Sequence, residues 1–342
     1  MNFCKGESHL NKQENMRLEK LLEQVQKPAR YIGGEMNAVE KDWEKAESTF
    51  AFCFPDTYDI AMSHLGMKIL YHLINEREDA LCERVCMPAA DMADLMRAND
   101  VPLYSLESRH ALNHFDIVGF TLQYEMSFTN ILEMLDLGRI PVYARDRENI
   151  FPIVVAGGPC AFNPEPLAPF IDAFMIGDGE DVMNELIDVI RDGKKQGLAK
   201  MDILRNLAKV EGVYVPALYD AAYNEDGTLA SFTPNDPTAP AVVKKRVVKD
   251  LSAASYPDSI PVPYTEIVHD RMVLEIMRGC TRGCRFCQAG MLYRPVRERS
   301  MDRLLELADK LQQSTGYEEM SLSSLSSGDF TCLPELISEL MK

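Results

Sequence analysis

Three cysteines in the last quarter of the chain have the residue type and the spacing for chemistry. Cys280, Cys284 and Cys287 follow the pattern C-x-x-x-C-x-x-C. Gly279 and Gly283 lie before and between them, and glycine lets the backbone turn so that three sulfurs can face one point. A loop of this kind is suited to hold one metal centre.

The number of thiols distinguishes the groups that the loop would bind. Structural zinc normally takes four protein ligands, but the next cysteine is Cys332, and His269 lies on the far side of the preceding strand. A disulfide would leave one of the three cysteines over. A cubane iron–sulfur cluster can use three cysteines and leave one iron open for a substrate or cofactor. We therefore expect an iron–sulfur cluster, with zinc as the alternative.

The elements around these cysteines are expected to be strands and helices in alternation. An apolar run over residues 272–277 has strand length, so the cysteines would lie on a loop at the carboxyl end of a strand. Barrel enzymes place their chemistry there. Ser300 is expected to cap a helix that reaches about residue 315, a second strand is expected over 318–324, and Pro334 opens another helix.

The cysteine loop resembles that of the radical SAM enzymes. In that superfamily the same spacing, with an aromatic residue before the last cysteine as Phe286 is here, binds a [4Fe–4S] cluster whose open iron holds S-adenosylmethionine. The resemblance implies reductive cleavage to a 5′-deoxyadenosyl radical, Phe286 near the adenine, and an electron donor such as flavodoxin or ferredoxin. It also implies that Ser327, Gly328 and Asp329 contact the methionine end. The usual turn has two glycines and Glu, and Ser-Gly-Asp is also an ordinary helix-initiating loop.

The chain before the cysteines alternates strand and helix patterns. Strands are expected over residues 49–54, 81–86, 117–123, 153–156 and 173–176, and helices over 62–75, 90–97, 128–137 and 180–191, with a short turn near Leu167. Five β/α units indicate an α/β fold with a doubly wound parallel sheet. The ligand crevice of such a sheet lies at the carboxyl ends of its strands.

Glycine-rich loops follow the fourth and fifth expected strands. Gly157-Gly158 and Gly177-x-Gly179 resemble loops of the cobalamin-binding-like domain that precedes many radical SAM enzymes. Further similar segments, at residues 27–35, 54–56, 106–108, 122–125, 157–166 and 177–180, extend the likeness to a poorly characterised subgroup of B12-binding-domain radical SAM proteins. The resemblance implies that these four glycines border a cobalamin.

A histidine ligand to that cobalamin is not expected. The familiar pattern is Asp-x-His-x-x-Gly, and Ser63-His64-Leu65-Gly66 does not fit it. Two alternatives stay open: cobalamin bound without a protein ligand, or a sheet that serves only as a docking wall for substrate. The other histidines carry less weight, and His110 is expected to lie in a solvated loop.

The expected organisation has four parts. Residues 1–47 form a helical extension and loop, 48–195 the cobalamin-binding-like domain, 196–270 a linker with a short helix and strands, and 271–342 the start of a radical SAM barrel. Only two β/α units follow residue 271, whereas such a barrel needs roughly six to eight. We therefore expect an amino-terminal fragment of a longer protein, or a barrel that another polypeptide completes.

Composition bounds the remaining possibilities. The 342 residues contain no apolar run approaching the roughly 18 residues of a membrane span, and the polar segment 11–23 does not fit a signal peptide. With nine cysteines, a reducing cytoplasmic location is expected. The net charge of −17 argues against nonspecific nucleic-acid binding. Arginines nevertheless crowd the cysteine region, at positions 271, 278, 282, 285, 294, 297, 299 and 303.

These arginines would either receive an anion, which could be a substrate such as RNA or the carboxylate of the cofactor, or be solvated or paired with acids. The expected overall reaction is radical methyl transfer if cobalamin binds, and methylthiolation or another hydrogen abstraction if it does not. The alternative is a non-catalytic iron–sulfur, zinc or cobalamin binding module, or an inactive fragment. No catalytic side chain is identified.

Overall fold

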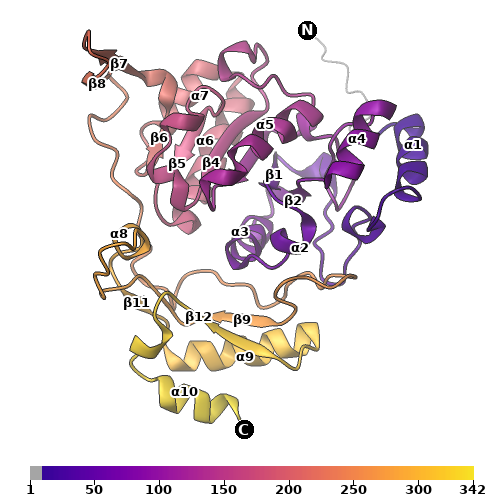
Figure 1. Cartoon of the computed structure of the whole chain (residues 1–342), viewed down its shortest axis with the longest axis vertical. Coiled ribbons are helices and arrows are strands. Elements are labelled where there is room, and N and C mark those ends of the chain that lie inside the picture. Colours follow the sequence, from indigo (N-terminus) through magenta and orange to yellow (C-terminus); the bar gives the residue numbers. More distant parts are fainter. Residues whose placement is uncertain (1–9) are drawn as a thin grey trace.

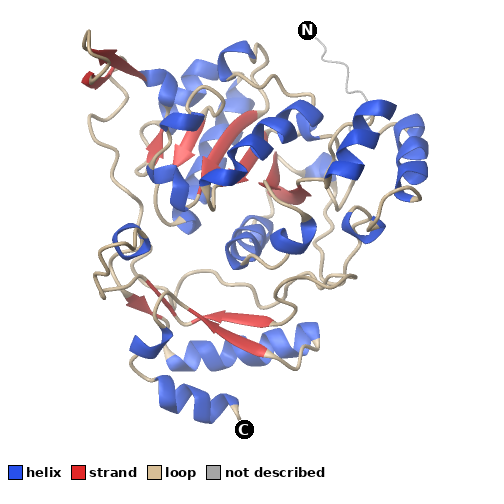
Figure 2. Ribbon diagram, in the orientation of Figure 1, coloured by secondary structure: helices blue, strands red, loops and turns tan. Residues whose placement is uncertain are grey.

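The chain folds into two bodies joined by an extended segment, as the computed structural model of residues 10–342 shows (Figure 1). The larger body is a sheet with helices on both faces. The smaller body is a short sheet covered by α9 (Met301–Thr315) and α10 (Leu333–Leu340), and it lies below the larger body in this view. Strands and helices alternate along much of the chain (Figure 2), so the expected α/β class is confirmed.

The sheet of the larger body has six strands in the order β2-β1-β3-β4-β5-β6. Five are parallel, and β6 pairs antiparallel with β5 at one edge. Their bounds are Ser48–Phe54 (β1), Ala80–Cys86 (β2), Ile117–Thr121 (β3), Ile153–Gly157 (β4), Ala173–Met175 (β5) and Val213–Tyr214 (β6). The expected doubly wound parallel sheet is confirmed, with one antiparallel strand added.

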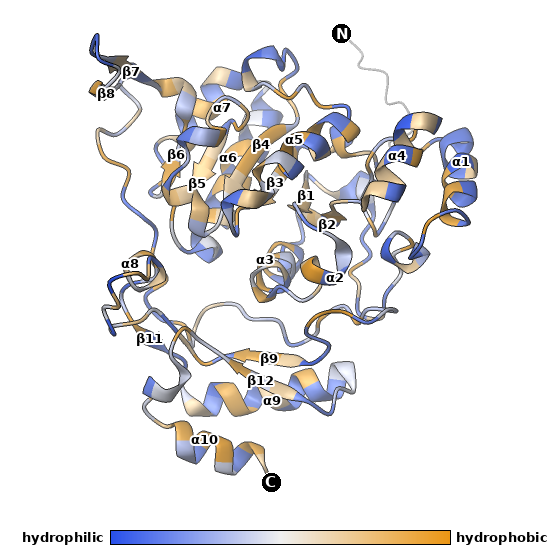
Figure 3. Ribbon diagram, in the orientation of Figure 1, coloured by the Kyte–Doolittle hydropathy of each residue, from blue (hydrophilic) through white to orange (hydrophobic). Residues whose placement is uncertain are grey.

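Helices cover the two faces of this sheet. The described α-helices of the larger body are α1 (Lys12–Leu22), α2 (Tyr58–Ala61), α3 (Leu65–Glu76), α4 (Ala90–Asn99), α5 (Phe128–Leu137), α6 (Gly179–Gln196) and α7 (Lys200–Leu207). Phe50 and Phe52 of β1 join the core under α3, α6 and α7, whereas Ala51 and Cys53 join the core under α4 and α5. Because both faces are covered, most residues of the strands are apolar, and the charged pair Glu83 and Arg84 of β2 is an exception. Figure 3 shows this in the hydrophobic colouring of β4 and β5.

One expected helix begins later than predicted. The helix expected over residues 62–75 is α3, which begins at Leu65, and residues 62–64 separate it from α2. The Nδ1 atom of His64 accepts a hydrogen bond from the backbone N–H of Met67 at 3.1 Å. This bond caps the first turn of α3 and sets its start.

The loop over residues 27–35 packs onto the larger body. Its last residue, Glu35, is buried and binds Arg84 of β2 at 2.8 Å. Gly33 adopts φ of +63°, and a Cβ there would lie 1.9 Å from the carbonyl oxygen of Leu106. This loop therefore covers the sheet by close backbone contact.

Residues 196–270, expected to be a linker, first extend the larger body. Ile203 of α7 and Val213 of β6 are buried in the same core as α3 and α6. A hairpin of β7 (Tyr219–Tyr223) and β8 (Leu229–Pro234) then projects from the body at the upper left of Figure 1. The chain is extended beyond this hairpin and crosses to the smaller body.

The smaller body contains the two expected β/α units. Strands β9 (Met272–Glu275) and β12 (Met320–Ser323) are parallel, and α9 connects them. A short hairpin of β10 (Met277–Arg278) and β11 (Arg297–Glu298) encloses the cysteine loop and α8 (Ala289–Leu292). None of the helices in residues 10–342 is long and apolar enough to cross a membrane.

Candidate functional site

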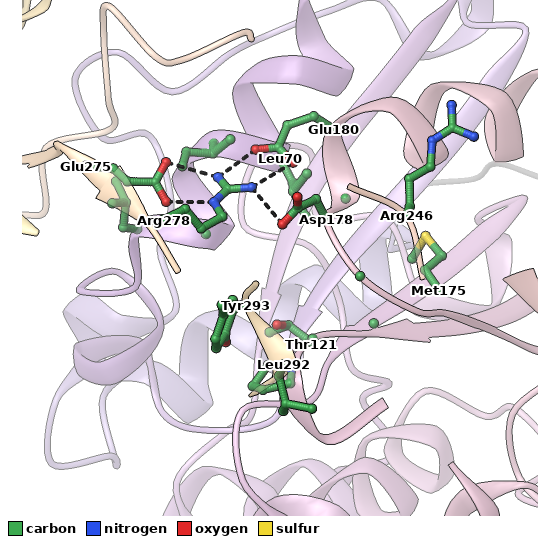
Figure 4. Close-up of a pocket in the computed structure, with 18 of the residues that line it drawn as sticks. Leu70, Thr121, Met175, Asp178, Glu180, Arg246, Glu275, Arg278, Leu292 and Tyr293 are labelled. Atoms are coloured by element: carbon green, nitrogen blue, oxygen red, sulfur yellow. Dashed lines mark hydrogen bonds and ion pairs between the residues drawn. The ribbon is translucent and has the colours of Figure 1, made fainter. Parts of the chain in front are cut away.

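A cavity of about 390 Å³ lies where the two bodies meet. It borders the carboxyl ends of β3, β4 and β5, the edge at which doubly wound sheets bind ligands. Its volume lies in the range of small-molecule sites, roughly 300–1,000 Å³. The lining includes Thr121 and Met175 from the larger body and Glu275, Arg278 and Tyr293 from the smaller body (Figure 4). Other lining residues of the larger body are Phe50, Phe52, His64 and Gln123.

The four glycines expected at a cobalamin all line this cavity. Two of them are also required by close backbone contacts. A Cβ on Gly158, whose φ is +109°, would lie 2.8 Å from the Leu122 carbonyl oxygen. A Cβ on Gly177, whose φ is +111°, would lie 2.1 Å from the Arg246 carbonyl oxygen. Protein backbone therefore already occupies the space beside these two glycines.

The other two glycines make ordinary or tight contacts with side chains. A Cβ on Gly157 would meet Met175 at 3.4 Å, and one on Gly179 would meet Leu70 at 3.1 Å. Packing within the chain thus accounts for part of the glycine pattern that the sequence analysis assigned to a cofactor. The assignment of these glycines to cobalamin stays a prediction.

His64 lines the same cavity as a neutral hydrogen-bond donor. Burial lowers the pKa of its imidazole to about 4, so the ring is uncharged near neutral pH. Because Nδ1 accepts the Met67 N–H, the ring proton resides on Nε2. Nε2 then offers a proton to the cavity. That His64 is not a ligand to cobalamin stays a prediction.

The cysteine loop of the smaller body begins directly beside the cavity. Gly279, which lines the cavity, has φ of +94°, and a Cβ there would lie 2.6 Å from the carbonyl oxygen of Pro295. Only glycine fits this close crossing of the two arms of the hairpin. The turn therefore fixes where Cys280 begins the loop.

The three thiols lie on this one loop, and Cys284 is exposed while Cys280 and Cys287 are half-buried. Within residues 10–342, no three His, Cys, Asp or Glu side chains converge as metal ligands. The expected convergence of the sulfurs is thus not present in this conformation. The donor set itself fits a cluster, because three thiols on an accessible loop are the ligands that an iron–sulfur centre uses.

Phe286 and Asp329, both expected at S-adenosylmethionine, lie in different environments. The side chain of Phe286 is 92% exposed and packs on nothing. Asp329, in the short helical turn Ser327–Asp329 after β12, accepts a hydrogen bond from Nε of Arg282 at 2.7 Å. Arg282 lies between Cys280 and Cys284, so the structure brings the second motif to the cysteine loop. Hydrogen bonding from Arg282 holds the pKa of the Asp329 carboxyl below its ordinary value.

A group of ion pairs joins the two bodies at the cavity wall. Arg278 of β10 binds Glu180 at 2.8 Å, Glu275 at 3.0 Å and Asp178 at 3.0 Å (Figure 4). Asp178 also binds Arg297 of β11. Burial disfavours the charge on Arg278, but Glu275 and Glu180 outweigh it and hold the pKa of Arg278 well above its ordinary value.

This group of ion pairs is the feature of the site that sequence reasoning missed. The sequence shows the concentration of arginines near the cysteines, and pairing with acids is one of the interpretations given above. The structure shows that pairing for six of the eight, at positions 271, 278, 282, 297, 299 and 303. The sequence signal for this group of ion pairs is Asp178 and Glu180 in the segment Gly177-Asp178-Gly179-Glu180, where the prediction used only the glycines.

Two family models match the chain. The one described as "Radical SAM proteins, N-terminal" matches residues 66–216, and the one described as "Radical SAM superfamily" matches residues 274–342. The first match lies in the larger body and the second in the smaller body. The two together cover most of the residues that line the cavity.

Two curated proteins are similar in sequence. The chain is 30% identical over 289 residues to the uncharacterized protein MJ0966 of Methanocaldococcus jannaschii, which covers 84% of this chain and 51% of that protein. It is 28% identical over 212 residues to the uncharacterized methyltransferase PH0819 of Pyrococcus horikoshii, which covers 60% of this chain and 38% of that protein. The chain thus spans about half, or less, of the length of these relatives.

A solved structure shares the fold. It is the radical S-adenosylmethionine methyltransferase TsrM from Kitasatospora setae, with cobalamin and a [4Fe–4S] cluster bound. The TM-score is 0.53 at 14% identity, over 85% of this chain and 52% of that chain. This likeness shows a shared fold over most of the chain. By the two family models, the chain belongs to the radical SAM family.

Proposed function

We propose that this protein binds a [4Fe–4S] cluster on Cys280, Cys284 and Cys287 and uses it to cleave S-adenosylmethionine beside the cavity. The observation that carries the proposal is the position of the cysteine loop. It leaves β10 at the cavity wall, and Arg282 within it is paired with Asp329 of the second motif. Two motifs 47 residues apart in sequence are thus adjacent where one small cofactor would contact both.

The chain's own residues have distinct roles in this proposal. The cluster, when bound, supplies the electron that cleaves S-adenosylmethionine to a 5′-deoxyadenosyl radical. Phe286, exposed on the loop, would pack against the adenine. Asp329, with Ser327 and Gly328, would accept the methionine ammonium in exchange for Arg282. An electron donor such as flavodoxin or ferredoxin and a cytoplasmic setting complete the proposal.

Methyl transfer assisted by cobalamin is the reaction we propose. Its support is that one similar protein is called a methyltransferase, and that a solved methyltransferase of the same fold holds cobalamin. In this chain cobalamin would lie in the crevice at Gly157, Gly158, Gly177 and Gly179, without a ligand from His64. An anionic substrate such as RNA is proposed from the exposed Arg285 and Arg294 near the loop.

The test is anaerobic reconstitution with iron and sulfide. The wild-type chain should bind about four irons and give a dithionite-reduced paramagnetic resonance signal that changes on adding S-adenosylmethionine. Cys284→Ala should lose that signal. Cys332→Ala is the matched control, since Cys332 lies outside the loop and should leave iron content and signal unchanged.

Other outcomes would support the alternative functions. One tightly bound zinc, with no signal that responds to S-adenosylmethionine, would indicate a structural metal module and contradict the proposal. Incubation with hydroxocobalamin followed by gel filtration tests the second cofactor. Cobalamin absorbance that does not elute with the protein would reject cobalamin-assisted transfer and leave methylthiolation or another hydrogen abstraction.

A further inference from the structure

Every N–H donor of Arg278 has a carboxylate partner. Nε donates to Glu275 at 3.0 Å, and Nη2 donates to Glu275 at 3.0 Å and to Glu180 at 2.8 Å. Nη1 donates to Glu180 at 3.3 Å and lies 3.0 Å from Asp178. Four hydrogen bonds and the ion pair with Asp178 therefore involve all three guanidinium nitrogens. Although Arg278 lines the cavity, an incoming anion would have to displace one of the three acids.

The three carboxylates come from both bodies. Glu275 ends β9 in the smaller body, whereas Asp178 precedes α6 and Glu180 lies in its first turn, in the larger body. Arg297 also binds Asp178, and Arg299 binds Glu275 at 3.4 Å. Three arginines thus face three carboxylates, and the group is neutral. Its side chains are largely buried, so the attraction between them is weakly screened by water.

Arg278 is separated from the first cluster cysteine by one residue. That residue is Gly279, whose backbone is held against the carbonyl oxygens of Tyr293 and Pro295. The chain therefore has little freedom between the guanidinium, which is anchored to α6, and Cys280. The position of the first thiol follows the position of the larger body.

We propose that Arg278 is a positioning residue that transmits the placement of the Asp178–Glu180 loop to the cysteine loop, and so sets where a cluster lies relative to the crevice. The proposal rests on the proposed function in one respect, that Cys280 is a cluster ligand. Lysine cannot take this role, because its ammonium has three donors and cannot hold three carboxylates in a planar fork.

Hydrogen–deuterium exchange of the chain without added iron tests the coupling. The amides to follow are those in the β10–β11 hairpin, together with the N–H of Arg299, which bonds to the Ile276 carbonyl at 2.9 Å. In Glu180→Gln, a change confined to the larger body, we expect these amides of the smaller body to exchange roughly tenfold faster, because a charged hydrogen bond is lost. Arg278→Gln and Arg278→Lys should do the same.

Arg303→Gln is the matched control. Arg303 is half-buried and pairs with Glu306 of the same helix, α9, in the smaller body, so its substitution should leave hairpin exchange unchanged. If Glu180→Gln left the hairpin at the wild-type rate, Arg278 would serve only its own body and the proposal would be overturned. This test holds even if an Arg278 variant fails to fold.

A second measurement separates positioning from simple support. After reconstitution, Glu180→Gln should retain its iron, while the change that S-adenosylmethionine causes in the reduced signal should fall severalfold. A full response to S-adenosylmethionine in this variant would contradict positioning. If the wild type itself binds no iron, the proposed function fails, whereas the exchange experiment still decides whether the two loops are coupled.

Discussion

Arg84 and Arg278 each bind more than one carboxylate, at sites that differ in what they join. Arg84, with a side chain 1% exposed, binds Glu107 at 2.6 Å and Glu35 at 2.8 Å within the larger body. Arg278, 13% exposed, binds acids from both bodies at the edge of a cavity. The first has fixed partners in one core, so its role is stability. The second has partners on both bodies, which supports the proposed role of Arg278 in placement.

Removal of Arg84 should cause the largest loss of stability. Arg84→Met leaves Glu35 and Glu107 buried without their cation, and loss of one partner from a buried pair costs about 3–5 kcal/mol. Burial raises the pKa of Glu35, but Arg84 outweighs burial and keeps that pKa below its ordinary value. We expect urea unfolding to show the full loss of stability for the larger body.

Arg97→Met provides the matched control. Arg97 binds Glu133 at 2.9 Å on the surface, with a side chain 43% exposed. Such pairs contribute about 0–1 kcal/mol. Equal losses in the two variants would show that the buried pairs of Arg84 do not stabilise the larger body.

The neighbouring residue Glu83 should make the stability of the larger body depend on pH. Its carboxylate accepts hydrogen bonds from Ser105 and Ser108, each at 2.5 Å, on the opposite side of β2 from Arg84. Burial, followed by the charge of Glu107, raises the pKa of Glu83 from 4.5 to about 7. Arg84 and His110 are the other titratable groups close to this site.

Because the folded pKa is above the unfolded one, the stability contributed by Glu83 is complete below pH 4.5 and is lost as pH rises through about 7. The shift corresponds to a loss of roughly 3 kcal/mol between pH 4.5 and 8. Glu83→Gln should remove this part of the pH dependence, measured by urea unfolding at pH 5 and pH 8. The same pH slope in both proteins would refute the assignment to Glu83.

The sequence was sufficient for most elements of the larger body. Residues 48–54 of β1 are apolar apart from Ser48 and Thr49, and a strand buried on both faces produces such a run without help from distant residues. The break before α3 was missed because it depends on one side-chain hydrogen bond of His64. His110, expected to be solvated, is buried because Trp43 stacks on its ring at 3.5 Å. That contact joins residues 67 positions apart.

Prediction of the site was also limited by contacts between residues that are distant in sequence. The spacing of Cys280, Cys284 and Cys287 is local and can be read directly. Arg278 and Glu180 are 98 residues apart, and only the docking of the two bodies places them together. Periodicity and composition describe single elements, so they do not predict how the two bodies dock.

Gly177→Ala tests the loop through which Arg278 contacts the larger body. A Cβ at this position would lie 2.1 Å from the Arg246 carbonyl oxygen, and the N–H of Asp178 donates to that oxygen at 3.0 Å. The extended segment must therefore move, and Asp178 with it. We expect a loss of roughly 2 kcal/mol beyond the backbone strain, from overpacking, together with faster exchange in the β10–β11 hairpin.

Gly197→Ala separates strain from displacement. Gly197 ends α6 with φ of +65°, and a Cβ there would meet nothing within 4 Å. Its substitution should cost only about 1–2 kcal/mol of left-handed strain and leave hairpin exchange unchanged. If the two alanine variants lost equal stability, contact with the Arg246 backbone would not explain Gly177. If Gly177→Ala alone accelerated the hairpin, the Gly177–Glu180 loop would control the cysteine loop through position and not through overall stability.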